Sequence, residues 1–171
     1  MFKQGDIVLY GSEGVCVIDE VMTRQFKEES MEYYILKSVY HPASKIFVPT
    51  QNEELMSRMK DILSKNEIYQ LLDDIKEEEL IWIDHDNQRK ERYKQIMKAG
   101  QRHELVSLIK TLYIRSKNLK ANGKKLNAAD DQFFRDAQKL LHEEIAYVLN
   151  IQQEEVGTFI SNHLGEEIIY S

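Results

Sequence analysis

The sequence predicts an α+β protein in which a small antiparallel β module precedes an all-α domain of about five helices. Up to Pro49, β-branched and aromatic residues come in short runs separated by turn formers, which is typical of strands. After Pro49, apolar residues recur three and four positions apart and proline is absent. This change of period places a β module at residues 1–60 and a helical domain at residues 61–165. Residues 166–171 have no evident packing partner and are expected to fray.

Four strands are expected in the β module, over residues 7–10, from 15 toward 26, 31–37 and 45–48. The first two are joined by residues 11–14, a turn whose two glycines can take positive φ. Four strands on so few residues favour a strongly curved sheet or a partial barrel, because a flat sheet of this size would leave one apolar face in water.

The helical domain has recognisable start and stop signals. Ser64 followed by Glu67 forms a capping box, which predicts a helix over about 65–75. Gly100 is suited to end the next helix, and Asn127 to begin a later one. The remaining helices are expected from 84 or 86 to 99, over 102–118, from 128 onward, and over 152–164.

Basic residues concentrate in the middle of the chain. Residues 86–126 hold 12 Lys or Arg against 3 Asp or Glu, whereas the rest of the chain holds 11 against 26, for a net charge of −6. A basic block between acidic segments is typical of a protein that contacts a polyanion with one face, and nucleic acid is the first partner to consider. The alternative is a solvated face that neighbouring acids balance.

The sequence offers little to support catalysis. The five histidines form no H-E-x-x-H motif and no zinc spacing with cysteine, and there is no phosphate-binding loop of the G-x-x-x-x-G-K-[ST] type. We therefore predict no enzyme, no metal or other cofactor, and no small-molecule substrate. The single cysteine, Cys16, lies in an apolar run and is expected to be buried. With no apolar run of about 20 residues and no secretory start, no membrane contact is expected and the protein is expected to be cytoplasmic.

Short motifs follow one another along the chain in this order: Phe2-Lys3-x-Gly5-Asp6-x-Val8-x-Tyr10, Gly14-Val15, Tyr34-x-Leu36-Lys37, Val48-Pro49, Arg92-Tyr93-Lys94, Ala99-Gly100, Leu112-Tyr113 and Ala137-x-x-Leu140-Leu141-x-Glu143. Their order and spacing resemble the CarD/CdnL family of bacterial transcription regulators, whose N-terminal module also occurs in transcription-repair coupling factors. The resemblance implies a Tudor-like or SH3-like β module that binds the β subunit of RNA polymerase. It also implies a nucleoid-associated protein whose helical module contacts promoter DNA and modulates open-complex stability, with little sequence specificity because the polymerase positions it.

The resemblance implies roles for three residues of the β module. Arg24 corresponds to a family arginine at the polymerase contact. A second family arginine corresponds to Phe47, and Lys45, two residues earlier on the same side of a strand, could compensate for its absence. The alternative for Phe47 is a place in the core.

Tryptophan marks the largest departure from the family. Relatives place a DNA-wedging Trp four residues before the tyrosine of Arg-Tyr-Lys, a position occupied here by Arg89, and the chain's single tryptophan is Trp82. Either Trp82 acts as the wedge from a longer helix, or Arg89 grips phosphate or stacks on a base in its place. A third possibility is that Trp82 packs in the core.

The other candidate DNA contacts are basic side chains suited to phosphate: Lys90, Arg92, Lys94, Lys98, Lys110, Lys117, Lys124 and Lys125. Two other non-enzymatic functions compete with this hypothesis. One is a sequence-specific repressor that reads bases with residues 87–89, and the other is an RNA-binding protein that uses a small β-barrel. Residues 1–85 hold 9 basic against 17 acidic residues, which favours a β module that docks on protein.

Overall fold

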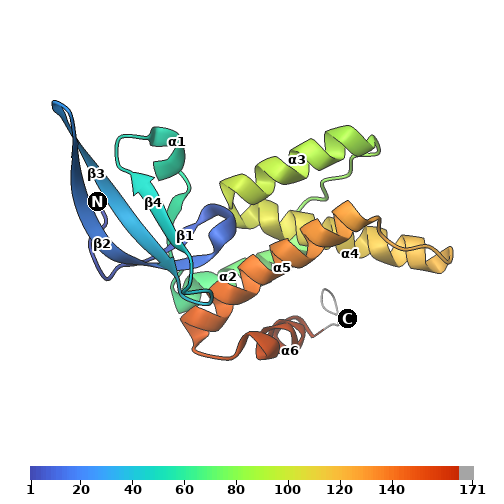
Figure 1. Cartoon of the computed structure of the whole chain (residues 1–171). Helices are drawn as coiled ribbons and strands as arrows, with labels where there is room; N and C mark the ends of the chain where they lie inside the picture. The colour runs from blue at the N-terminus through green and yellow to red at the C-terminus, as the bar shows by residue number, and fades with distance from the viewer. Residues whose placement is uncertain (166–171) are drawn as a thin grey trace. The chain divides into compact units, whose positions relative to one another are not determined.

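The computed structural model describes residues 1–165, so the predicted tail 166–171 lies outside the described residues. The chain folds as two compact units, Met1–Ile62 and a second unit that begins at Leu63 (Figure 1). The first is built on a five-stranded antiparallel sheet and the second on helices, which confirms the predicted α+β class.

The strands of the first unit are β1 (Ile7–Tyr10), β2 (Val15–Phe26), β3 (Glu29–Ser38), β4 (Lys45–Pro49) and β5 (Met59–Asp61). They lie in the order β4-β3-β2-β1-β5, and every neighbouring pair is antiparallel. The four predicted strands are present, and β5 is an addition. The turn before β2 is a short 3-10 segment, Gly11–Glu13, with positive φ at its first residue, Gly11, and at Gly14 directly after it, as expected.

One face of the sheet carries the core of the first unit. The pairing of β2 with β3 shifts between Ile18 and Glu20, which is a bulge that bends the strand. The short helix α1 (Glu53–Met56) adds Leu55 and Met56 to the core. The buried members are Val8, Tyr10, Cys16, Ile18, Tyr34, Leu36, Val48 and Met59. Cys16 has no exposed surface, which confirms the prediction of its burial.

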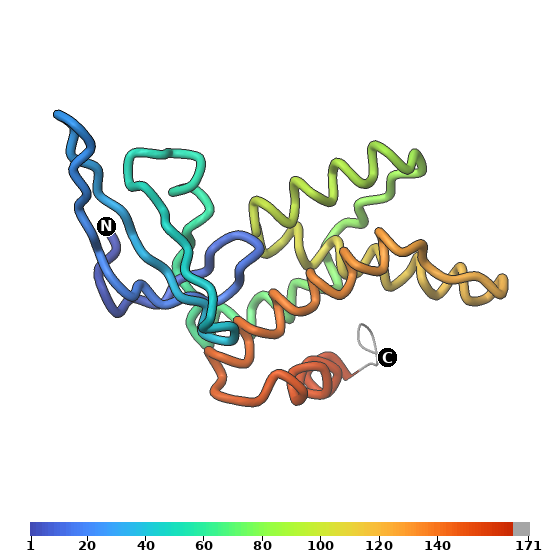
Figure 2. The backbone as a smooth tube through the Cα atoms, viewed as in Figure 1, coloured from blue at the N-terminus to red at the C-terminus, as the bar shows by residue number. Residues whose placement is uncertain are grey.

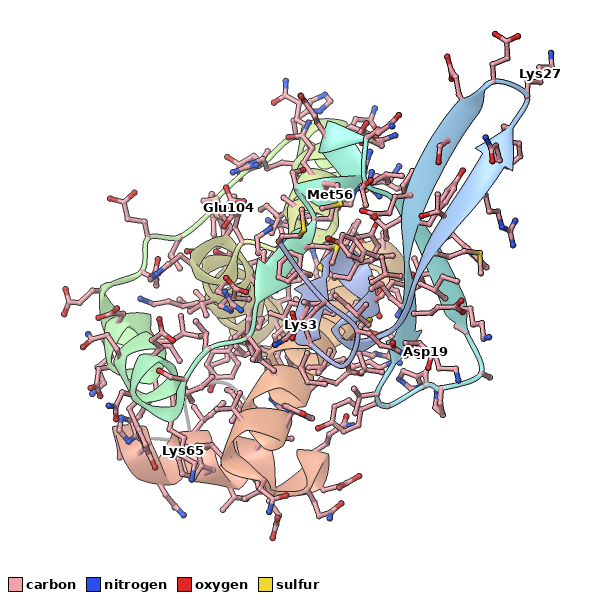
Figure 3. The ribbon with its side chains drawn as sticks, turned by 90° about the vertical axis from the view of Figure 1, so that its left-hand side faces the viewer. Lys3, Asp19, Lys27, Met56, Lys65 and Glu104 are labelled. Carbon is pink, nitrogen blue, oxygen red and sulfur yellow. The ribbon has the colours of Figure 1, made fainter. Side chains whose placement is uncertain are left out.

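Strands β2 and β3, of 12 and 10 residues, continue as a two-stranded ribbon beyond the other strands (Figure 2). The residues of β2 from Val21 onward are mostly exposed, because the sheet has no third strand at the end of this ribbon. The ribbon turns through Lys27 and Glu28, and Lys27, labelled at the tip in Figure 3, has a positive φ of 56°. A residue with a Cβ is strained in this conformation.

The helices of the second unit are α2 (Lys65–Asp74), α3 (Asp86–Ala99), α4 (Arg102–Ala121), α5 (Ala128–Leu149) and α6 (Gln153–Leu164). A 3-10 turn, Ile75–Glu77, follows α2, and α4 continues three residues past its predicted end. The predicted capping box is present: the Ser64 hydroxyl accepts the Glu67 N–H at 3.2 Å, and the Glu67 carboxylate accepts the Ser64 N–H at 2.8 Å. This second bond holds the pKa of Glu67 below its ordinary value.

Helices α4 and α5 form the centre of the second unit. The apolar side of α4 predicted from the sequence is buried, and α5 buries the side chains that face it. The buried leucine and isoleucine residues of the two helices are Leu105, Leu108, Ile109, Leu112, Leu140, Leu141 and Ile145. Among the described residues, no helix combines the length and the apolar character needed to cross a membrane. Within residues 1–165, no cluster of His, Cys, Asp or Glu is arranged to hold a metal ion.

Candidate functional site

The face of the sheet opposite the core, which we call the outer face, brings Arg24 and Phe47 together. The sequence resemblance assigned both positions to the polymerase contact. The Arg24 guanidinium lies 5.8 Å from the centroid of the Phe47 ring, a cation–π arrangement. The Arg24 Nε also donates to the Met22 Sδ at 3.2 Å. In the strand pairing, Arg24 lies opposite Met31 and Met22 opposite Tyr33, so these side chains share one side of the sheet. The outer face therefore places the Arg24 cation against Phe47, beside the apolar side chains of Met22, Met31 and Tyr33.

Phe47 is 47% exposed, so the alternative that it belongs to the core is wrong. Its neighbour Val48 takes the core position on β4 instead. Lys45 is exposed, and strand alternation puts it on the same side as Phe47. Lys45 lies opposite Lys37, which pairs with Asp19 at 3.6 Å.

Arg89 is buried, and this corrects the expectation that it grips DNA. Only 2% of its side chain is exposed. Its Nε donates to both carboxylate oxygens of Asp130, at 3.3 and 3.2 Å, and its Nη2 donates to Asp86 at 2.8 Å. Burial acts to lower the pKa of Arg89, but the hydrogen bonds and charges of Asp130 and Asp86 outweigh burial and raise it. The guanidinium joins α3 to α5 and is not available to a phosphate.

Trp82 lies in a loop. Helix α3 begins only at Asp86, so a longer helix does not carry the indole, and 47% exposure excludes a core position. The indole N–H donates to the Asp84 carboxylate at 3.1 Å. The guanidinium of Arg115 on α4 lies 5.5 Å from the ring centroid. The structure therefore excludes both the longer helix and the core position, and it leaves Trp82 as an exposed aromatic group held on a loop.

Lys110 binds the protein's own backbone. Its ammonium donates to the carbonyl of Lys76 at 2.8 Å and to that of Glu78 at 2.9 Å. These bonds satisfy carbonyls at the end of the 3-10 turn after α2. The expectation that Lys110 contacts a phosphate is therefore not supported, because its ammonium is engaged within the fold. Lys117 is exposed and lies over the Tyr113 ring, with its Nζ 4.9 Å from the centroid.

Apart from Arg89, the predicted cations of α3 fall into two groups. Arg92 pairs with Glu104 of α4 at 2.6 Å and is half-buried. Lys90, Lys94 and Lys98 are exposed at successive four-residue intervals, so they form a row along one side of α3. Within this row, Lys94 pairs with Glu91 at 3.3 Å.

The end of α4 and the segment after it carry four exposed lysines, Lys117, Lys120, Lys124 and Lys125, which we call the lysine cluster. Figure 1 shows the last turns of α4 projecting beyond the start of α5. An open hollow of about 420 Å³ adjoins the cluster, and its lining includes Lys125 and Arg135, of which Arg135 pairs with Asp131. Sequence reasoning missed Arg115 and Lys120. The only signal for either residue was its membership of the basic block.

Comparison with known proteins matches both units to domains of one protein family. Residues 2–60 match the model of the CarD-like/TRCF RID domain, and residues 67–161 match that of the CarD C-terminal domain. A protein of Bacillus subtilis (strain 168) named "Putative transcription factor YdeB" is 25% identical over 166 residues, which cover 93% of this chain and 99% of that protein. The chain belongs to the CarD family of transcription regulators, whose N-terminal module is shared with transcription-repair coupling factors.

Proposed function

We propose that this protein binds the β subunit of RNA polymerase through the outer face of its sheet and promoter DNA through its helical unit, and thereby modulates open-complex stability. One observation carries the proposal: the chain joins a CarD-like/TRCF RID module to a second unit whose exposed lysines gather at the end of α4. The first unit brings the protein to the polymerase, and the second acts on the DNA that the polymerase holds.

The outer face is suited to a protein partner of mixed character. The stacking of Arg24 on Phe47 reduces the side-chain freedom that binding would otherwise remove. Phe47 and Phe26 are 47% and 53% exposed, and aromatic and arginine side chains are the usual anchors of protein interfaces. We therefore expect a partner surface that offers one carboxylate to Arg24 beside an apolar recess.

The helical unit is suited to phosphates and not to base sequence. Apart from Arg135, which pairs with Asp131, its exposed cations are lysines, which act as mobile point charges and do not form the planar forks used for base reading. Trp82 offers an aromatic surface on which an unpaired base can stack. Such stacking occurs in melted DNA but not in closed duplex, and only this difference in affinity can shift the equilibrium between closed and open complexes.

The polymerase contact is tested by capture of RNA polymerase on the immobilised full chain. Arg24→Glu should abolish capture, and Phe47→Ala should weaken it roughly tenfold or more, the range of an interface anchor. The matched control is Lys27→Glu at the tip of the same ribbon, which makes the same charge reversal outside the Arg24–Phe47 contact. Capture by Arg24→Glu at the level of this control would refute the proposed contact.

The DNA contact is tested by replacing Lys124 and Lys125 together with glutamate. Affinity for duplex DNA of any sequence should fall, and the lifetime of open promoter complexes should change with it. Lys139→Glu, at an exposed lysine of α5 outside the cluster, is the control and should have little effect. A sharp preference for one duplex sequence would instead indicate a sequence-specific repressor, and a preference for RNA would indicate an RNA-binding protein.

A further inference from the structure

We infer that Arg115 is a positioning residue that fixes the indole of Trp82 on the surface. The consequence of this positioning for DNA binding rests on the proposed function. Nothing in the sequence pattern singled out Arg115. Residues 78–84 form neither helix nor strand, and they follow one side of α4.

The loop is attached to α4 at successive turns. The Glu78 carboxylate contacts His103 and accepts a hydrogen bond from the Ser107 hydroxyl at 3.3 Å. The Ile81 N–H donates to the Thr111 hydroxyl at 2.9 Å, and Arg115 lies over the Trp82 ring. The four α4 residues in these contacts are His103, Ser107, Thr111 and Arg115. They are four positions apart and therefore share one side of the helix, so the loop runs along this side and ends at the indole.

Two contacts hold the indole itself. The Asp84 carboxylate accepts its N–H at 3.1 Å and fixes the edge of the ring. The Arg115 guanidinium, 5.5 Å from the ring centroid, contributes a cation–π interaction with the ring. Because 47% of Trp82 remains exposed, these contacts orient the side chain without burying it.

Arg115 is itself held in place by a buried carboxylate. Its Nε lies 3.9 Å from the Asp130 Oδ2, and its side chain is 21% exposed. Asp130 already accepts hydrogen bonds from Arg89 and from the Asn127 amide. The charge of Asp130 is thus largely balanced by Arg89, and it orients Arg115 without drawing it away from the indole.

A fixed indole binds a base more tightly than a mobile one, because the freedom of its side chain is lost before binding. The planar guanidinium suits this task. Lysine would keep the charge but could not stack on the ring or reach Asp130 with the same geometry. Arg115→Lys therefore separates positioning from charge.

The test uses the full chain and the fluorescence of Trp82, the single tryptophan in the sequence. Without DNA, Arg115→Lys and Arg115→Ala should lower the fluorescence anisotropy and raise the acrylamide quenching constant. The matched control is Lys117→Ala, which removes a cation of the same helix that lies over Tyr113 and should leave both readouts unchanged. Unfolding curves for the Arg115 variants verify that each is folded at the temperature of the measurement.

The second readout compares a forked DNA, which has unpaired branches, with a duplex of the same length. Arg115→Lys should keep duplex affinity and lose roughly two- to fivefold of the fork preference, the size of one exposed cation–π contact. Lys117→Ala should weaken fork and duplex alike. Unchanged anisotropy and quenching in both Arg115 variants would overturn the inference. If these optical changes occur but the unaltered protein shows no fork preference, Arg115 positions Trp82 and the proposed DNA role of Trp82 fails.

Discussion

Replacing Arg89 by methionine should destabilise the helical unit strongly, because it leaves a buried carboxylate without its main partner. The two side chains are 2% and 4% exposed. Breaking a buried ion pair from one side costs about 3–5 kcal/mol. Here the loss should lie near the lower end, about 3 kcal/mol, because Asp130 keeps the Asn127 amide at 3.3 Å and Arg115 at 3.9 Å. Asp86 is 80% exposed, so the loss of its ion pair with Arg89 adds little to the destabilisation.

Urea unfolding followed by Trp82 fluorescence measures this loss in the helical unit, since the chain's single tryptophan lies there. With a urea dependence of about 1.5 kcal/mol per molar, a loss of about 3 kcal/mol lowers the midpoint by about 2 M. Lys90→Met is the matched control. It makes a similar replacement at the next, exposed position of the same helix and should change the unfolding free energy by less than about 0.5 kcal/mol.

A double replacement distinguishes a buried ion pair from simple loss of packing. Arg89→Met combined with Asp130→Leu removes both charges and should recover a large part of the stability lost by Arg89→Met alone. If Arg89→Met instead costs no more than Lys90→Met, Arg89 is not held in a buried pair in solution. Its guanidinium would then be available to DNA after all.

Two further predictions concern the ribbon tip and a histidine of α5. Lys27→Gly should stabilise the first unit by about 0.5–1 kcal/mol, because glycine accepts a φ of 56° without strain. Lys27→Ala keeps the Cβ and should give no gain in stability. Thermal unfolding followed by circular dichroism measures both variants. Burial lowers the pKa of His142 from 6.5 to about 4, so the unfolded chain takes up a proton first as pH falls. The helical unit should therefore lose on the order of 2–3 kcal/mol between about pH 6.5 and pH 4. This loss should disappear from the pH dependence of unfolding in His142→Gln and remain in His85→Gln, a change at an exposed histidine.

The elements that the sequence predicted well are those fixed by neighbouring residues. The Ser64–Glu67 box and the left-handed Gly100 act within one helical turn, so their residue types alone locate the helix ends. Strand β5 escaped prediction for the opposite reason. Its three residues, Met59–Asp61, show no apolar alternation, and they form a strand only because β1, some fifty residues earlier, offers a free edge.

The environment of the candidate DNA-contact residues was harder to predict because their partners are distant in sequence. Arg89 is buried by Asp130, 41 residues away, and Lys110 is engaged by a carbonyl 34 residues before it. Charge counting located the basic block but could not tell which of its cations the fold itself uses. The exposure of Trp82 could not be predicted from the sequence either, since it depends on the loop that α4 holds.

The fold's use of these cations has a measurable consequence for DNA binding. Affinity should fall with salt with a log–log slope of about −0.9 for each phosphate that a cation neutralises. The four residues of the lysine cluster therefore give about −3.6, and adding the α3 row of Lys90, Lys94 and Lys98 gives about −6. All 12 basic residues of the block would give about −11, a value that the internal contacts of Arg89, Arg102 and Lys110 forbid. Titrations of duplex DNA at several salt concentrations decide between the two smaller values. Lys124→Ala with Lys125→Ala should flatten the slope by about 2 in either case. Lys94→Ala should flatten it by about 1 only if the α3 row takes part, so this variant is the one that decides. A slope near −11 would show that the ion pairs of the helical unit open on DNA, and the static arrangement of its cations would then not describe the bound state.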